Sequence, residues 1–348
     1  MLASVPPDEP PLLLAARRQP TPFTPVWLMR QAGRYMPEYR ALRARHSFLD
    51  LCKTPQAAAE VTLQPVERLG VDAAILFADI LLIVEPLGVG LEFAKGEGPV
   101  IHRPVRGASD VAGLAAIDVP STLGFVFETV RLVRHALGAR IPLIGFAGAP
   151  FTVASYVVEG GPSRDFAATK RLMHEEPDAW ARLLALLARA TTVYLNGQIA
   201  AGAQAVQLFD SWVGALSPDD YREFVLPHTR AVIRGLTPGV PVIHFGTGTA
   251  GLLSAMREAG GDVIGLDWRI DLDAGWRAVG DDIAVQGNLD PVALLSPPAR
   301  FEPAVRSILG RARGRRGHIF NLGHGILQST PVDHVKALVA MVHELSSR

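Results

Sequence analysis

Residues 25–40 of the chain read PVWLMRQAGRYMPEYR, an apolar run that turns abruptly into a segment crowded with arginine. The apolar part predicts a buried strand, and Arg30, Arg34 and Arg40 follow it. An arginine side chain presents a planar fork of donors that binds carboxylates bidentately, so a pocket for an anionic ligand is one interpretation. The alternative is a solvated helical turn in which Arg34 pairs with Glu38 four residues on, and this stretch taken alone favours that alternative.

Similar apolar runs, rich in β-branched residues and bounded by Gly, Pro or helix-start signals, recur along the chain. There are eight: PVWLM (25–29), AAILFAD (73–79), PLIGFAGA (142–149), AVQLFDS (205–211), PVIHFG (241–246), DVIGLDW (262–268), AVQGNLD (284–290) and HIFNLGHG (318–325). Segments with helical periodicity separate most of them. Strands that alternate with helices predict a parallel sheet, and strands that are apolar throughout predict that both faces are covered. Eight such units favour an α/β fold of the (β/α)8 TIM-barrel type over an open sheet.

Several signals place helices between these runs. Thr54 is expected to cap a helix that has Pro55 in its first turn, and Pro227 should kink or divide a helix that begins at Ser217. The expected helices cover residues 55–68, 217 to beyond 225, 164–202 in two parts divided at Pro177, 249–260 and 331–346.

One insertion interrupts the alternation. Residues 89–105, VGLEFAKGEGPVIHRPV, alternate apolar and polar side chains around Lys95 to Gly98, which predicts a β-hairpin after the second strand. Residues 1 to about 12 read as a proline-rich tail that leads into a short helix. We therefore expect one catalytic domain over residues 1–348.

Composition restricts the functional classes. Apolar residues make up 49% of the 348 residues, ample for a large core, and the 34 basic residues equal the 34 acidic ones. No overall field would attract nucleic acid or an anionic membrane, so we expect neither as a partner. A single cysteine, Cys52, excludes an intramolecular disulfide and any site built from several thiolates, which fits a reducing, cytoplasmic setting. The N-terminus has no pattern of a signal peptide or a membrane span.

Reactive groups of such barrels cluster at the carboxyl ends of the strands, so the last residue of each run is informative. Asp79 ends an otherwise apolar run, AAILFAD. It could cap the turn at Ile80, or it could be a lone carboxylate in a low-dielectric cavity that accepts from ligand N–H groups and stabilises a developing cation. A charge pair at about 4 Å with an effective dielectric near 20 is worth roughly 4 kcal/mol, about a thousandfold in rate if the charge exists only in the transition state.

Three other side chains near strand ends could contact a ligand. His324 has glycine on both sides, in NLGHGI, and is a candidate for proton transfer, although a structural histidine is an equal alternative. Tyr156 could bond a ligand carboxylate or belong to the core. Ser211 lacks the G-x-S-x-G pattern and is interpreted as a hydrogen-bond donor rather than a nucleophile.

Two further motifs carry little weight. The Gly246–Thr249 turn resembles a phosphate cradle but lacks the Walker lysine, and a tight strand-to-helix connection explains it. The histidines are scattered and no H-E-x-x-H motif occurs, so we predict no metal site.

Several segments together resemble the uroporphyrinogen decarboxylase family. PVWLMRQAGRYMPEYR resembles that family's N-terminal signature, and GFAGAPFTVASYVVEGG (145–161) resembles its second. LFADILL, QLFDSW, GLDW, QGNLDP and FNLGHG follow in the family's order, so the resemblance spans roughly residues 25–342.

The resemblance implies a cofactor-free enzyme on a distorted (β/α)8 barrel. Such enzymes convert the four acetate side chains of uroporphyrinogen III to methyl groups, which gives coproporphyrinogen III and four molecules of CO2. The family is typically homodimeric. Its arginines that bind carboxylates and are proposed to donate protons match Arg30 and Arg34, and a further substrate-binding arginine matches Arg43.

The same resemblance assigns the centre of the cleft. The family's central aspartate matches Asp79, and its cleft tyrosine, serine and histidine match Tyr156, Ser211 and His324. We count Phe146 among the substrate-binding residues.

Two questions stay open at this point. The proton donor could be Arg30, His324, Tyr156 or a protonated substrate carboxylate, because an arginine with a pKa above about 12 is a poor acid at neutral pH. The alternative function is that of the related methyltransferases that use corrinoid or folate donors. Those enzymes hold zinc with histidine and cysteines, a set that Cys52 alone cannot supply.

Overall fold

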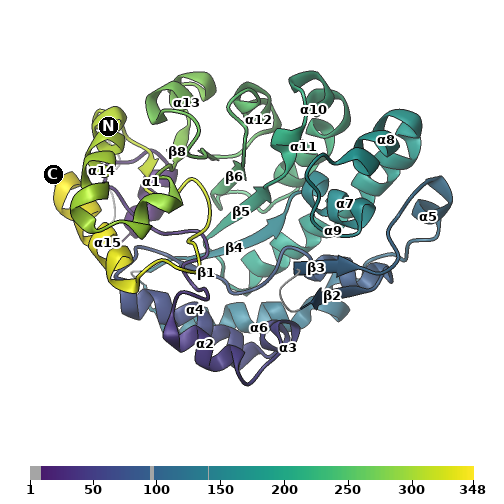
Figure 1. Ribbon diagram of the computed structural model, residues 1–348, viewed down its shortest axis with the longest axis horizontal. Helices are drawn as coiled ribbons and strands as arrows, with labels where there is room; N and C mark the ends of the chain where they lie inside the picture. The colour runs from purple at the N-terminus through teal and green to yellow at the C-terminus, as the bar shows by residue number, and fades with distance from the viewer. Residues whose placement is uncertain (1–8, 95–97, 140) are drawn as a thin grey trace.

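The computed structural model describes residues 9–94, 98–139 and 141–348, and its central feature is a curved parallel sheet with helices on its outer side (Figure 1). The sheet has seven strands in the order β1-β4-β5-β6-β7-β8-β9, and every neighbouring pair is parallel. The strands are β1 (Ala74–Ile75), β4 (Leu143–Gly148), β5 (Ala205–Asp210), β6 (Val242–Gly246), β7 (Val263–Gly265), β8 (Ala284–Gln286) and β9 (His318–Ile319).

Residues 25–29 close this sheet into a ring. Val26 forms an isolated parallel bridge with Phe320 beyond β9, and the Phe320 N–H donates to the Pro25 carbonyl at 2.8 Å. On the other side, the Asp72 N–H donates to the Val26 carbonyl at 2.8 Å, just before β1. The first run therefore takes the eighth position, between β9 and β1, which confirms the predicted TIM-type barrel.

The regular strands are shorter than the apolar runs that predicted them. β1 covers two residues of the run 73–79, and β9 covers two of the run 318–325. The extra residues leave the ladder at the carboxyl ends of the strands, where they form the loops above the barrel. The expected strand lengths were thus wrong at this edge, because apolar burial continues into the rim after hydrogen-bonded pairing has stopped.

Most predicted helices are present, and some of their boundaries differ. Pro227 lies at the start of a second helix, and Pro177 opens the long helix α9, so both prolines divide helices as expected. Thr54 precedes α4 but does not cap it, since its hydroxyl donates to the Asp50 carbonyl at 2.7 Å. The helix expected from residue 249 begins at Leu253.

The helices of the described residues are α1 (Pro11–Ala16), α2 (Pro37–Arg43), α3 (Phe48–Lys53), α4 (Pro55–Leu69), α5 (Ala108–Ala112), α6 (Val119–Leu137), α7 (Pro150–Glu159), α8 (Ala167–Glu175), α9 (Pro177–Ala201), α10 (Pro218–Phe224), α11 (Leu226–Arg234), α12 (Leu253–Ala259), α13 (Leu272–Val279), α14 (Pro298–Ala312) and α15 (Val332–Ser346). Short 3-10 segments cover Leu82–Leu87, Val213–Ala215 and Pro291–Leu295. Across the described ranges, no helix combines the length and the apolar character that a membrane crossing requires.

The predicted hairpin after the second strand is present. β2 (Leu91–Ala94) pairs antiparallel with β3 (Gly98–Ile101), and the Ile101 N–H donates to the Gly160 carbonyl at the end of α7. The expected turn at residues 95–97 lies outside the described residues. The hairpin lies beside the helical layer on the side of α7 and α9 (Figure 1).

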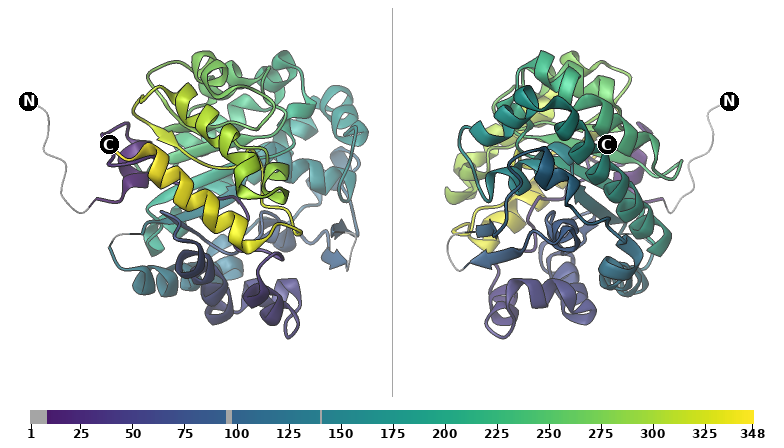
Figure 2. Two further views of the ribbon diagram at one scale, coloured as in Figure 1. Left: turned by 60° about the vertical axis from the view of Figure 1, so that its left-hand side comes forward. Right: turned by 90° about the vertical axis from the view of Figure 1, so that its right-hand side faces the viewer.

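The two ends of the described chain meet on one side of the barrel (Figure 2). The Thr24 N–H donates to the Ser346 hydroxyl at 2.8 Å, and the Arg348 N–H donates to the Pro22 carbonyl at 3.0 Å. The C-terminal helix α15 thereby supports the segment that closes the ring.

The barrel interior contains a short polar chain among apolar side chains. The Trp27 indole N–H donates to Gln286 at 2.9 Å, and Gln286 donates in turn to Gln207 at 3.1 Å. All three side chains are buried, and they join the closing segment to β8 and β5. Hydrogen bonds of this kind across a core favour one register of the ring.

Candidate active site

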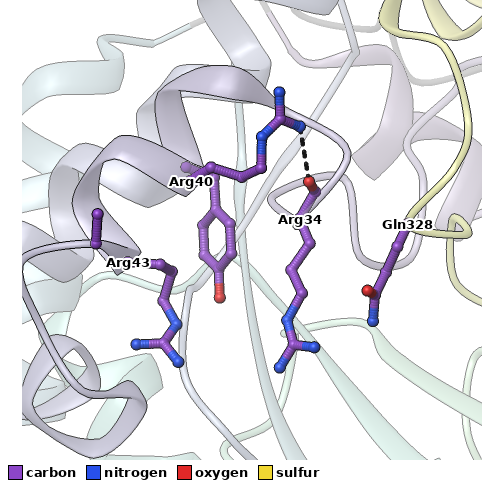
Figure 3. Close-up of a pocket in the computed structure, with 6 residues that line it drawn as sticks. Arg34, Arg40, Arg43 and Gln328 are labelled. Carbon is purple, nitrogen blue, oxygen red and sulfur yellow. Dashed lines mark hydrogen bonds between the residues drawn. The ribbon is translucent and has the colours of Figure 1, made fainter. Parts of the chain in front are cut away.

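A cavity of about 460 Å³ opens beside α2, next to the segment that closes the barrel (Figure 3). Its wall contains three guanidinium groups, two of them from the arginine-rich stretch 25–40 that suggested a pocket for an anionic ligand. The lining residues are Arg34, Tyr39, Arg40, Arg43, Ala44 and Gln328.

The arginines of this wall have different roles. Arg40 donates from Nη1 to the backbone carbonyls of Arg34 and Tyr35, at 2.9 and 3.0 Å, and so braces the loop. The side chains of Arg34 and Arg43 extend in the same direction, and Arg34 lies beside Gln328 (Figure 3). Arg43 also uses one donor, since its Nη1 donates to the His46 carbonyl, and the cationic groups of Arg34 and Arg43 both line the cavity.

The alternative pairing of Arg34 with Glu38 is wrong. Glu38 instead lies 3.6 Å from the guanidinium of Arg68, on α4. The reason is local: Pro37 opens α2, so Arg34 precedes the helix and shares no helical face with Glu38. Among the described residues, Arg34 takes part in no ion pair.

Arg30 stands at the sharp turn that ends the closing segment. Its backbone has a φ of 61°, in the left-handed region that costs a non-glycine residue roughly 1–3 kcal/mol. The neighbouring Gln31 is fully buried and holds the turn: it accepts from the Leu28 N–H and donates to the Ala73 carbonyl, both at 3.0 Å. This clasp fixes the direction in which the exposed Arg30 side chain leaves the barrel.

Asp79 follows β1 and is partly buried. One carboxylate oxygen accepts from the Leu81 N–H at 2.8 Å, so the capping role is real, but it uses only one of the two oxygens. Burial raises the pKa of Asp79 to about 6, against the lowering effects of the Leu81 hydrogen bond and the Arg30 charge. A partly buried carboxylate with a raised pKa beside one cation is typical of functional sites.

Tyr156 lies on α7 and stacks on Trp212, with ring centroids 3.8 Å apart. Burial, together with the Asp79 charge, raises the pKa of the Tyr156 phenol well above its ordinary value, and Arg30 opposes this. The phenol therefore keeps its proton and can donate a hydrogen bond to a carboxylate.

Close packing requires the two glycines that flank His324. A side chain at Gly325 would overlap Arg30, and one at Gly323 would overlap the backbone of Trp268. Burial lowers the pKa of His324 to about 4, and the nearby charges of Arg30 and Arg269 add to the effect. The imidazole is thus neutral at physiological pH.

The hydrogen bonding of His324 also assigns its tautomer. Nδ1 accepts from the Gly325 N–H at 2.7 Å, so the proton of the neutral ring resides on Nε2. His324 can donate a hydrogen bond from Nε2, and it is a poor store of an acidic proton.

Phe146 lies in β4, and Ser211 directly follows the neighbouring strand β5. The Ser211 carbonyl accepts from the Thr247 hydroxyl, which ties the end of β5 to the loop after β6. Phe146 is buried in β4 and makes an edge contact with Phe209 at 5.5 Å, and Phe209 contacts Phe245 at 6.0 Å. These aromatic rings form an apolar layer inside the barrel.

The predicted residues fall into two linked groups. Arg30, Asp79, Tyr156 and His324 share one electrostatic environment, because Arg30 shifts the pKa values of the other three. Arg34 and Arg43 belong to the cavity, and both Arg43 and Asp79 act on the buried thiol of Cys52, which connects the groups. No described contact joins Ser211 or Phe146 to either group.

Sequence reasoning missed Gln31 and Gln328. Gln31 is a lone polar residue inside a signature already crowded with charge, and no spacing rule marks it as buried. Gln328 reaches the cavity only because the loop after β9 folds back over α2. Neither residue carries a signal that a single sequence provides.

The Gly246–Thr249 turn is a structural connection. The Gly248 N–H donates to the Asp267 carboxylate after β7, and the Thr247 hydroxyl donates to Ser211 after β5. These two donors are thus used within the protein itself, which agrees with the interpretation as a tight strand-to-helix connection.

Cys52 lies in α3, where its thiol is buried. Burial raises its pKa far above the ordinary value, which opposes the thiolate that zinc binding requires. In the ranges that the structure describes, no cluster of three or more histidine, cysteine, aspartate or glutamate side chains is arranged to hold a metal ion.

Comparison with known proteins gives consistent results. The model of the family "Uroporphyrinogen decarboxylase (URO-D)" matches residues 8–345. A uroporphyrinogen decarboxylase of Sorangium cellulosum is 59% identical over 334 residues, covering 96% of this chain and 95% of that protein. One of Carboxydothermus hydrogenoformans is 57% identical over 336 residues, covering 96% of each chain.

A solved structure described as a methyltransferase from Methanosarcina mazei has a similar fold. Its TM-score is 0.80 at 21% sequence identity, over 96% of this chain and 97% of that one. At this identity the likeness concerns the fold alone, so it does not favour the methyltransferase alternative. The family model and the close relatives decide the matter: the chain belongs to the uroporphyrinogen decarboxylase family.

Proposed function

We propose that this chain, a carboxy-lyase by family, removes the four acetate carboxyl groups of uroporphyrinogen III in tetrapyrrole biosynthesis, and that Asp79 is the centre of its site. The activity follows from family membership. The observation that carries the proposed roles is the partly buried Asp79 carboxylate, whose pKa is raised by burial and which senses the charge of Arg30.

The substrate has two kinds of polar group, and different residues of the site would bind each of them. Its ring of four pyrrole N–H groups would donate to Asp79, whose second carboxylate oxygen is not needed for the Leu81 cap. Its carboxylate arms would meet the guanidinium groups of Arg34 and Arg43 and the donors of Tyr156 and His324. Ser211 would add a hydroxyl donor, and Phe146 would support the apolar underside of the macrocycle.

Each decarboxylation needs a sink for the electrons of the broken bond. Protonation of the ring carbon next to the acetate arm creates a pyrrolium cation, the C–C bond electrons flow into it, and CO2 leaves. The exocyclic methylene then takes up a proton and the ring carbon loses one, so each step consumes one proton overall. Asp79 as a carboxylate would stabilise the pyrrolium, worth about 4 kcal/mol at contact distance.

The pKa values reduce the number of candidate proton donors. His324 has a pKa of about 4 and Tyr156 one raised above its usual range, so neither supplies an acidic proton readily at neutral pH. By the same criterion a guanidinium is a poor acid as well, so a substrate carboxyl group that Arg30 contacts is favoured over Arg30 itself as the donor. No metal ion or organic cofactor enters this scheme.

One assay tests the function. The protein is incubated anaerobically with uroporphyrinogen III, and the products are separated by carboxylate number. We expect hepta- through tetracarboxylate species and four CO2 per substrate. Tight binding without CO2 release would instead support a non-catalytic anion-binding barrel, and zinc with methyl transfer in the same sample would support the methyltransferase alternative.

Two further expectations come from the family resemblance. We propose a homodimer with facing clefts and a cytoplasmic location. Sedimentation equilibrium at micromolar concentration should give twice the 37.3 kDa chain mass. Cell fractionation should place the activity in the cytosolic fraction.

A further inference from the structure

The loop after β7 lies across the barrel from Asp79. In the closed ring of eight positions, with residues 25–29 between β9 and β1, the position of β7 is four steps from β1 in either direction. Arg34 and Arg43 both come from the opposite part of the rim, in and before α2. A substrate with carboxylate arms all around its macrocycle also presents arms to the β7 side, where those two arginines do not reach.

Arg269 occupies this far rim in a well-defined geometry. Its guanidinium carbon lies 3.8 Å from the centre of the Trp268 ring, and Nη1 donates to the Asp267 carboxylate at 2.7 Å. The Asp267 side chain is 1% exposed, whereas that of Arg269 is 50% exposed. A stacked guanidinium with one anchored edge loses little rotamer freedom when its other donors bind a ligand.

The anchor does not cancel the charge of Arg269. Asp267 also accepts from the backbone N–H groups of Gly248 and Arg269, so three donors share its negative charge. The ion pair uses one of the terminal nitrogens of a group that has five N–H donors. The half of the side chain that remains exposed can therefore meet an anion.

The charge of Arg269 also acts on a residue of the candidate site, His324. The Trp268 ring makes an edge contact with His324, with centroids 6.3 Å apart, and Gly323 packs against the Trp268 backbone. The charge of Arg269 lowers the pKa of His324, as that of Arg30 does. His324 thus lies between one cation on the near rim and one on the far rim.

We propose that Arg269 binds a carboxylate arm of the substrate on the side of the macrocycle opposite the reacting pyrrole, as a specificity-determining residue held in place by Trp268 and Asp267. The inference rests on the proposed function. The contact would be equally strong in the ground state and in the transition state, because the carboxylate arm bound by Arg269 does not change while the acetate C–C bond breaks on the opposite side of the barrel. It should therefore act on substrate affinity and leave the chemical step unchanged.

The test compares Arg269→Leu and Arg269→Lys with the wild type in steady-state decarboxylation of uroporphyrinogen III. We expect KM to rise about tenfold in Arg269→Leu, with kcat within about twofold, for the loss of one charge-assisted contact at a half-exposed site. Arg269→Lys should recover only part of the affinity, because an ammonium does not stack as a planar fork. Arg277→Leu, which removes an arginine paired with Asp273 on the outer helix α13, is the control and should not change KM.

Two further measurements distinguish a loss of substrate binding from a structural change and from an effect on turnover. In Arg269→Leu, the NMR titration of His324 should move to higher pH, because the Arg269 charge that lowers its pKa is removed. Fluorescence titration with oxidised uroporphyrin, which cannot be decarboxylated, should show weaker binding than in the wild type. If the histidine titration shifts while both KM and porphyrin affinity stay at wild-type values, the inference is wrong.

The same experiments keep the two proposals apart. Absence of CO2 release by the wild type would contradict the proposed function, whereas normal turnover with an unchanged KM in Arg269→Leu contradicts only the role of Arg269. If Arg269→Leu fails to fold, Arg269→Gln keeps a donor for Asp267 while it removes the charge, and the same increase in KM is expected.

Discussion

The substitution Asp79→Asn tests the centre of the proposed site through both rate and stability. Asparagine keeps an oxygen for the Leu81 N–H, so the local turn should survive. It removes the negative charge that would stabilise the pyrrolium. A contact worth about 4 kcal/mol in the transition state predicts a fall in kcat of about a thousandfold.

The stability effect has a defined sign and pH window. The folded-state pKa of Asp79 is about 6, above its ordinary value of 3.8, so the folded protein holds a proton that the unfolded chain releases as pH rises. Stability is therefore lost between these two values, and the loss is complete above pH 6. Two pKa units correspond to about 3 kcal/mol, which partial exposure reduces to about 2 kcal/mol.

Asparagine has no such loss, so Asp79→Asn should be more stable than the wild type at pH 8 although it is nearly inactive. Urea titrations at pH 5 and pH 8 should show the stability difference widening by about 1 kcal/mol between the two conditions. For the wild type, kcat/KM should fall as pH drops through about 6, when the carboxylate becomes protonated. Asp178→Asn, which removes an exposed carboxylate at the start of α9, is the control and should change neither the rate nor the pH dependence.

Two results would refute this reasoning. Turnover of Asp79→Asn within tenfold of the wild type would remove the cation-stabilising role. A stability difference that stays constant between pH 5 and pH 8 would mean that burial does not raise the pKa of this carboxyl group. Because the two measurements are independent, either part of the argument can fail alone.

Three other predictions concern the groups around Asp79. Substitution His324→Asn should raise KM and keep the ionisation near pH 6 in the pH–rate profile, and loss of that ionisation in this variant would restore His324 as the acid. Gln31→Leu removes the two hydrogen bonds that hold the turn at Arg30, and it should lower kcat by roughly ten- to a hundredfold and stability by about 1–3 kcal/mol. If the variant unfolds at lower urea concentration but is folded in the assay and keeps the wild-type kcat, Gln31 does not position Arg30. Arg43→Ala should raise KM about tenfold with little change in kcat, as expected for a carboxylate clamp beside Arg34, and a fall in kcat at constant KM would contradict it.

Much of the architecture could be predicted because its signals are local. Runs that are apolar on both faces, separated by helical periodicity, are typical of parallel strands, and Pro177 and Pro227 divide helices wherever they occur. Residues at strand ends, such as Asp79 and His324, could be identified because ring topology brings the carboxyl ends together.

The failures concern hydrogen-bond and charge partners that spacing along the chain does not specify. The spacing of Arg34 and Glu38 suggested a salt bridge, but Glu38 pairs with Arg68 on another helix. Thr54 is a residue type that commonly caps helices, but its hydroxyl donates to the Asp50 carbonyl one turn back instead of capping α4. Gln31 gave no signal, because its function depends on two backbone groups that only the closed ring brings to it.

By itself, the sequence determined the succession of strands and helices and the fold class, since these depend on periodicity and on residue chemistry. Tertiary structure alone decided how those residues are charged and where they face. Burial between Arg30 and Arg269 makes His324 a neutral donor, and burial beside β1 raises the pKa of Asp79 to about 6. Desolvation and charge proximity depend on three-dimensional packing, and no spacing along the chain specifies them.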